Sequence, residues 1–222
     1  MRVVRLTWLT AAAFALGARG QAGSPANAVV VADFSNPGIS PSHWTLTLHR
    51  DGSGHFHSER GDPPPAAVQE MDAPNVDREI QLSADFVERV FQTAQRHNWF
   101  NEECESHLKV AFQGWKKLSY HGSEGQGACT FNYSQDKEIQ ALGDSVVGVA
   151  ETVREGARLE MLLQHDRLGL DREMEYLTDG AKDGRMQQIG AIREILERLV
   201  EDPEVLDRVR KRARVLLAHA GT

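Results

Sequence analysis

The chain has 222 residues and carries 32 acidic side chains against 25 lysines and arginines, a formal net charge of −7 at pH 7. This acidic balance excludes a general electrostatic attraction to nucleic acid or to anionic membranes, so we expect neither as a partner. The length suits one domain, or one domain with an extension, and it is sufficient to enclose a hydrophobic core.

The first 22 residues have the organisation of a secretory signal peptide. Arg2 and Arg5 precede an apolar run, Leu6–Leu16, and small residues then offer cleavage sites. A bilayer span needs about 20 apolar residues, and neither this run nor any later one reaches that length. We therefore expect residues 1–22 to be removed, leaving a secreted or periplasmic protein with no membrane span.

The chain has only two cysteines, Cys104 and Cys129. In an exported protein an even number of cysteines predicts a structural disulfide. The chain-entropy model assigns such a bridge roughly 3–4 kcal/mol of stability. Two free thiols or a redox pair are the alternatives, although redox pairs usually have the Cys-x-x-Cys spacing.

A first hairpin is predicted near the start of the mature chain. Trp44–His49 has an apolar residue at every second position, which is typical of a half-buried strand. The turn residues Asp51–Ser53 would return the chain along His55–Ser58. A three-residue loop there places Leu48 opposite Phe56, so both side chains share one face of the sheet.

A helix and a second hairpin are predicted next. Residues 84–97 follow the N-cap candidate Ser83 and have apolar side chains at helical spacing. Leu108–Phe112 and Trp115–Tyr120 flank two residues that end in Gly, which favours a tight hairpin. The two aromatic residues beside that turn would then face each other across the strands. Both hairpins are expected to pack on helices.

The predicted organisation is an α+β fold with a helical extension. Residues 23–41 are rich in Gly, Ser, Pro, Ala and Asn and predict a flexible tether, although Val29–Val31 can add a short strand. Residues 42–167 form the disulfide-pinned α+β domain, whose small antiparallel sheet consists of the two hairpins. Residues 168–222 form the helical C-terminal extension, with a linker at 178–184.

The order strand–strand–helix–strand–strand–helix resembles a bacterial exported family of unknown function. The residues that carry the resemblance are Thr45–Leu48 with Asp51-Gly52, then Lys109–Leu118, and then Cys129–Tyr133. The layout is also similar to small periplasmic folds that bind proteins or inhibit proteases and lactamases. The resemblance implies no catalytic residue, because none is known for that family.

A histidine cluster gives one candidate site. In the predicted register His49 faces His55, and His57 lies two residues further along the same outer face. Neutral imidazoles grouped in this way can bind Zn²⁺ or Cu²⁺. The alternative is the solvated polar face of an antiparallel sheet. Only Glu59 is near enough to extend the ligand set, so we expect no bound metal.

A second candidate site is a group of titratable residues at a predicted helix junction. His165, Asp166 and Asp171 could perform acid–base chemistry as part of an envelope hydrolase or transferase. The alternative is that these residues form helix caps and ion pairs. A cleft lined by all three would favour the enzyme, whereas their use as caps would count against it.

The last predicted helix is strongly basic and is a candidate partner-binding surface. Its cations are Arg208, Arg210, Lys211, Arg212 and Arg214. They can dock on an acidic partner, a lipid surface or an envelope polyanion, or they can form a solvated face that complements the negative end of the helix dipole. Taken together, the sequence favours an exported, non-enzymatic binding or protein-interaction module with no cofactor. The partner would be another protein, bound through the sheet face or the helical tail.

Overall fold

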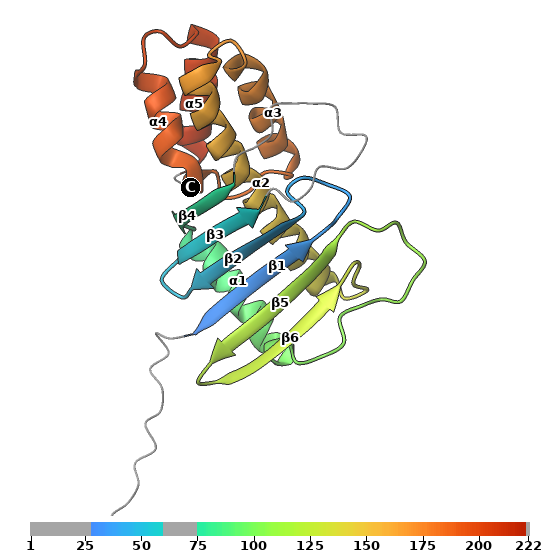
Figure 1. Cartoon of the computed structure of the whole chain (residues 1–222). Helices are drawn as coiled ribbons and strands as arrows, with labels where there is room; N and C mark the ends of the chain where they lie inside the picture. Colours follow the sequence, from blue (N-terminus) through green and yellow to red (C-terminus); the bar gives the residue numbers. More distant parts are fainter. Residues whose placement is uncertain (1–27, 60–74, 221–222) are drawn as a thin grey trace, which may run out of the picture.

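The computed structural model describes residues 28–59 and 75–220 (Figure 1). The predicted signal peptide, 1–22, and the proline-rich stretch at 63–65 lie outside the described residues. No helix among the described residues is long and apolar enough to cross a membrane.

The predicted α+β class is confirmed, with a larger sheet than two hairpins. Six antiparallel strands lie in the order β4-β3-β2-β1-β5-β6. The strands are β1 Val29–Ser35, β2 His43–His49, β3 Ser53–Glu59, β4 Val76–Gln81, β5 Trp115–Gly122 and β6 Gly125–Phe131. The helices are α1 Ala84–Arg96, α2 Lys137–His165, α3 Leu170–Asp183, α4 Arg193–Glu201 and α5 Asp207–His219, with 3-10 turns η2 Asn98–Phe100 and η3 Ile189–Ile192.

Within the predicted tether, 23–41, the alternative of a short strand at Val29–Val31 is confirmed, because β1 lies between β2 and β5 inside the sheet. Its buried and partly exposed residues alternate, and Val30, Ala32 and Phe34 are in the core. The strand is longer than predicted and runs to Ser35, so this part of the segment is not a tether. β1 belongs to the fold because a strand pairs with each of its edges, and the composition of a segment does not reveal such pairing.

The predicted register of the first hairpin is also wrong, by two residues. Leu48 lies opposite Gly54, and Phe56 lies opposite Leu46. The three loop residues are 50–52, because Gly52 adopts the positive φ of 84° that the last position of such a loop requires. The pleat is unchanged, so Phe56 still faces the core.

The second predicted hairpin is displaced along the chain. Leu108–Phe112 forms no strand, and β5 instead pairs with β6 through a tight turn at Ser123-Glu124. The predicted contact between Phe112 and Trp115 exists, but as a local contact rather than a cross-strand pair. Their ring centroids lie 5.8 Å apart in an edge-to-face arrangement.

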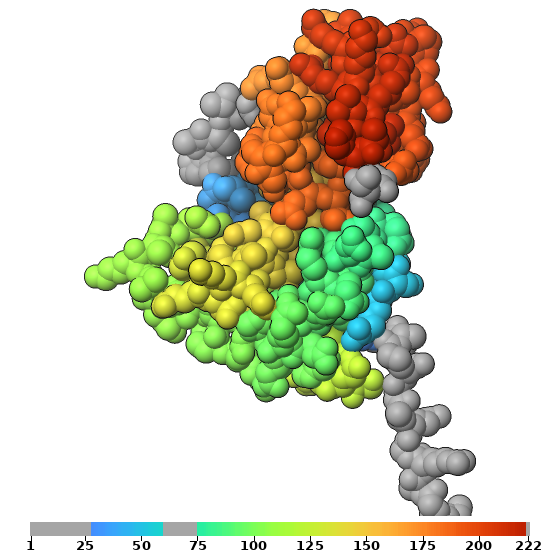
Figure 2. Space-filling view, turned by 180° about the vertical axis from the view of Figure 1, so that it is seen from behind, coloured from blue at the N-terminus to red at the C-terminus, as the bar shows by residue number. Residues whose placement is uncertain are grey.

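One long helix connects two hydrophobic cores. The inner face of the sheet packs with α1 and the first part of α2, up to Ala157. The second core begins at Leu159, still inside α2, and continues through α3, α4 and α5. Figures 1 and 2 show the helical part beyond one end of the sheet. The helical unit therefore starts before residue 168, and the linker predicted at 178–184 is helical as far as Asp183.

A polar layer lies where the two cores meet. Glu155 of α2 is only 7% exposed, and its Oε1 has no hydrogen-bond partner among the described residues. Its neighbour is Glu173 of α3, whose Oε2 lies 3.0 Å from Nε of Arg158. Burial, together with the hydrogen bond and charge of Glu173, raises the pKa of Glu155 to about 9.

Candidate functional site

The candidate site is a projecting segment between η2 and β5, residues 105–113, which we name the arm. The arm forms no helix or strand and projects beyond the sheet as the green tip at the left of Figure 2. It carries apolar side chains at alternate positions, with Leu108 53%, Val110 43% and Phe112 51% exposed. Trp115, at the start of β5, is 44% exposed and contacts Phe112.

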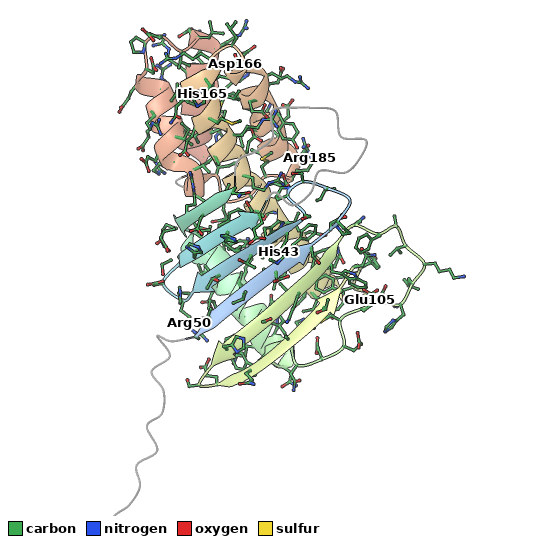
Figure 3. All side chains as sticks on the ribbon, viewed as in Figure 1. His43, Arg50, Glu105, His165, Asp166 and Arg185 are labelled. Carbon is green, nitrogen blue, oxygen red and sulfur yellow. A yellow bond between two sulfur atoms is a disulfide. The ribbon has the colours of Figure 1, made fainter. Side chains whose placement is uncertain are left out.

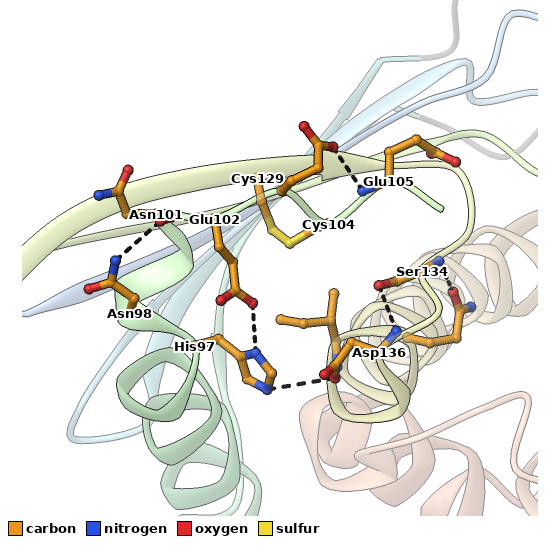
Figure 4. Close-up of a disulfide and its surroundings, with 12 residues drawn as sticks. His97, Asn98, Asn101, Glu102, Cys104, Glu105, Cys129, Ser134 and Asp136 are labelled. Atoms are coloured by element: carbon orange, nitrogen blue, oxygen red, sulfur yellow. Dashed lines mark hydrogen bonds and ion pairs between the residues drawn. A yellow bond between two sulfur atoms is a disulfide. The ribbon is translucent and has the colours of Figure 1, made fainter. Parts of the chain in front are cut away.

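The start of the arm is fixed to the sheet by the predicted disulfide, which the structure contains. Cys104 and Cys129 are bonded, with their Cα atoms 5.6 Å apart (Figure 4). Two residues further on, the backbone N–H of Ser106 donates to the carbonyl of Tyr133 at 2.9 Å. The arm therefore leaves the sheet from a covalently fixed position.

Glu105 reinforces this attachment with its carboxylate. Its Oε2 accepts a hydrogen bond of 2.6 Å from the backbone N–H of Asn132, and its Oε1 accepts one of 3.1 Å from His107. Desolvation alone would raise the pKa of Glu105, but these backbone donors outweigh it and the pKa lies below its ordinary value. The ionised Glu105 carboxylate therefore fixes the start of the arm to the end of β6 through these hydrogen bonds.

The far end of the arm is held by the side-chain amide of Asn132. Its Oδ1 accepts from the backbone N–H of Gln113 at 2.7 Å, and its Nδ2 donates to the carbonyl of Ala111 at 3.1 Å. The backbone carbonyl of the same asparagine accepts from Nζ of Lys116 at 2.9 Å. Asn132 therefore connects both ends of the arm to the end of β6.

Gly114 forms the hinge between the arm and β5. It has a φ of 112°, and a Cβ at this position would collide with the ring of Phe34. Only glycine adopts this backbone conformation without strain and leaves room for the ring. The sharp change of direction here separates the exposed arm from the paired strand.

The backbone of the arm is partly unpaired. Within the described residues, the N–H groups of Lys109, Ala111 and Phe112 donate no hydrogen bond. Alternating apolar side chains beside free backbone donors are the features that let a segment pair with an extended strand of another chain. The arm is therefore suited to strand addition, with Trp115 as an aromatic contact beside it.

The outer sheet face gathers histidines with carboxylates, in a different grouping from the predicted one. His55 places Nδ1 3.0 Å from Oε1 of Glu79 and Nε2 3.2 Å from Oδ1 of Asp77. His57 places Nδ1 2.9 Å from Oδ2 of Asp77 and Nε2 3.4 Å from Oε1 of Glu59. Hydrogen bonds to Asp77 and Glu59 raise the pKa of His57 above its ordinary value.

The third predicted member, His49, does not join this network. It lies opposite Val29 of β1, and Thr47 takes the place opposite His55 where His49 was expected. A further pair on the same face joins Nε2 of His43 to Oδ2 of Asp33 at 3.2 Å. In the described part of the chain, no three His, Cys, Asp or Glu side chains are arranged to hold a metal ion.

Of the candidate acid–base residues, His165 and Asp166 lie at the far end of the helical unit, away from the sheet (Figure 3). His165 ends α2, and Asp166 is its C-cap, with Oδ1 accepting from the backbone N–H of Gly169 at 3.2 Å. Asp171 lies in the first turn of α3 and pairs with α5. A depression at this end of the bundle is lined by none of the three. These positions match the capping alternative.

The basic helix α5 is largely neutralised within the chain. Arg208 Nε and Arg212 Nη1 each lie 2.7 Å from Oδ1 of Asp171. Arg210 and Lys211 pair with Asp207 of their own helix, at 3.5 and 2.8 Å. Four of the five predicted docking cations therefore have an acidic partner within the chain, and two of them share Asp171.

Comparison with protein-family models, with curated proteins and with solved structures finds no match to this chain. The resemblance to an exported family therefore stays a prediction.

Sequence reasoning missed the arm as a site. The pattern Leu108, Val110, Phe112 is the alternation that predicts a half-buried strand, and it does not reveal that the segment lies outside the sheet. Reasoning also missed β4, which supplies the carboxylates that contact the histidines. Asp77 and Glu79 lie two positions apart, so in a strand both side chains would be on one face. This spacing was the signal that could have indicated a strand with a charged outer face.

Proposed function

We propose that this protein is an exported, non-enzymatic interaction module that binds an extended segment of another protein through the arm. The observation that carries the proposal is the exposure of Leu108, Val110 and Phe112 on a segment fixed at both ends. These three side chains lie at alternate positions of one short segment, and exposed groups of apolar side chains commonly mark interaction sites.

The energetics of such an interface favour the arm over the other surfaces. Covering a large apolar side chain contributes about 1.5–3 kcal/mol, and aromatic residues near the centre of an interface often dominate binding. Phe112 and Trp115 supply the aromatic pair. The disulfide and Asn132 order the arm before binding, which reduces the conformational entropy lost on association. A disulfide is also typical of proteins in oxidising compartments, which supports export.

The charges around the arm define the partner more closely. Lys109 and Lys117 are exposed beside the apolar positions. A partner strand with alternate apolar residues, flanked by Asp or Glu, would complement both the apolar side chains and these two cations. The free N–H groups of the arm would donate to the carbonyls of that strand.

The test is photo-crosslinking in the native cell envelope. A photoreactive residue at position 112 is expected to trap one protein reproducibly, whereas the same residue at Gln126, exposed on β6, traps none. The double variant Leu108→Ser/Phe112→Ser should then lose at least tenfold in affinity for the trapped protein. Leu168→Ser is the matched control, because Leu168 is 81% exposed on the helical unit. Equal losses in both variants, or no trapped protein, would overturn the proposal.

A further inference from the structure

A cavity of about 760 Å³ lies between the sheet unit and the helical unit. It is bounded by the start of α1, by η3, and by the last turns of α3 and α5. Its apolar lining comes from Leu82, Met186, Ile189, Val215 and Leu216. Cavities of this size and character typically hold small organic ligands.

The charged lining of the cavity has a single sign. Lys182 and Arg193 line it, and no acidic residue does so within the described chain. This is notable in a protein with more acidic than basic side chains. A ligand that occupied the cavity would therefore meet an apolar interior and a positively charged edge.

The neutral polar groups of the lining are already paired within the chain. Thr178 Oγ1 donates to the carbonyl of Met174 at 2.6 Å. Gln188 Oε1 accepts from the backbone N–H of Ser83 at 2.8 Å. These groups offer little for recognition of a polar ligand such as a sugar, so the cations are left as the main polar contacts.

Lys182 and Arg193 retain hydrogen-bond donors for a ligand. Lys182 Nζ lies 3.1 Å from Oδ1 of Asp179, and both residues belong to α3. Arg193 Nη1 lies 3.5 Å from Oε1 of Glu197, and both residues belong to α4. Such surface pairs are weak, and both cations have more donors than one carboxylate occupies. The Lys182 side chain is 71% exposed and that of Arg193 is 46% exposed, which places both at the mouth.

We propose that this cavity binds a medium-chain fatty acid. The acyl chain lies against the apolar residues Met186, Ile189 and Leu216, and the carboxylate lies at the mouth beside Lys182 and Arg193. This arrangement satisfies both halves of the lining, since an anionic amphiphile combines a long apolar body with a negatively charged end that complements the two cations.

The first test is calorimetric titration of the disulfide-bonded chain with octanoate, decanoate and dodecanoate below their micellar concentrations. Burial of one methylene contributes about 0.8 kcal/mol, which corresponds to about fourfold in affinity. Each two-carbon step is therefore expected to tighten binding by roughly 16-fold while the cavity fills. Absence of binding by all three acids would overturn the proposal.

The second test locates the ligand with charge variants on one helix. Val215→Glu places a carboxylate at the cavity and should weaken dodecanoate binding at least tenfold. Ala218→Glu makes the same charge change on an exposed α5 residue that does not line the cavity, and it should have little effect. Equal behaviour of the two variants would show that the acid binds elsewhere and overturn the site.

The third test separates the carboxylate contact from the apolar contact. Lys182→Ala/Arg193→Ala should weaken binding of dodecanoate but not of dodecanol. If both ligands weaken equally, the proposed role of the cations is wrong. The chain could instead bind no fatty acid and self-associate, with the association abolished by Val215→Glu. The cavity surface would then be an interface between copies of the chain, and the proposal would fail.

Discussion

The side-chain oxygen of Asn132 accepts a hydrogen bond of 2.7 Å from the backbone N–H of Gln113, nineteen residues away in the sequence. This contact closes the arm against the end of β6 at the point where the chain turns into β5. The disulfide fixes one end of the arm, and this asparagine fixes the other. The position of the exposed apolar residues therefore depends on one covalent attachment and on several hydrogen bonds, most of them made by Asn132 and Glu105.

Replacement of Asn132 by alanine should release the far end of the arm. The substitution leaves the Gln113 N–H and the Ala111 carbonyl without their partner, and we expect a loss of about 1–3 kcal/mol in the free energy of unfolding. Limited trypsin digestion should cleave after Lys109 several-fold faster than in the parent chain. Gln126→Ala, on the exposed face of β6, is the control. An unchanged cleavage rate would show that Asn132 does not order the arm.

Removal of the disulfide should destabilise the protein more than any single hydrogen bond. The double variant Cys104→Ser/Cys129→Ser loses the constraint on a sequence separation of 25 residues, and we expect roughly 3–4 kcal/mol less stability. Urea unfolding, monitored by tryptophan fluorescence, measures the loss. Reduced parent protein should behave as the double variant does. A loss below about 1 kcal/mol would contradict the chain-entropy account of this bridge.

The buried carboxyl of Glu155 should make stability fall with rising pH. Its pKa is raised to about 9 in the folded protein, above the ordinary value of 4.5, so the folded state binds an extra proton between these values. Folding therefore becomes less favourable as pH rises through that window. Glu155→Gln removes the titrating group and should be more stable than the parent at pH 8, by on the order of 1–3 kcal/mol.

The same Glu155→Gln substitution should have a much smaller effect at pH 5, where the parent residue is protonated in the folded protein. Urea unfolding at pH 5, 7 and 8 gives the comparison. Glu194→Gln, an exposed position on α4, controls for the change in net charge. If both variants show the same pH dependence as the parent, the buried carboxyl is not the titrating group.

His57 of the outer sheet face should have a pKa above that of free imidazole. Hydrogen bonds to Asp77 and Glu59 raise the pKa of His57, so its protonated form stabilises the fold below its unfolded pKa, and this contribution is lost as pH rises through the folded value. Proton NMR titration should find the pKa of His57 above 6.5, and Asp77→Asn should lower it. A value at or below 6.5 in the parent chain would contradict the hydrogen-bond geometry.

Several properties followed from local sequence. The spacing of apolar residues predicted α1, because an amphipathic helix with Ser83 at its N-cap needs only residues close in the chain, and the structure shows Ser83 Oγ accepting from the Phe86 N–H. The pairing of Cys104 with Cys129 followed from the count of cysteines. The α+β class followed from the two kinds of apolar spacing in the sequence, since period two and period 3.6 bury one face of different elements.

The rest required the tertiary structure, because it depends on contacts between distant residues. The flanks of β1 resemble a tether, and only its two neighbouring strands make it part of the sheet. The apolar alternation of Leu108, Val110 and Phe112 is the same whether or not a partner strand lies beside it. Whether those side chains are buried or exposed is decided by β6, which takes the available edge of β5 and leaves the arm outside the sheet.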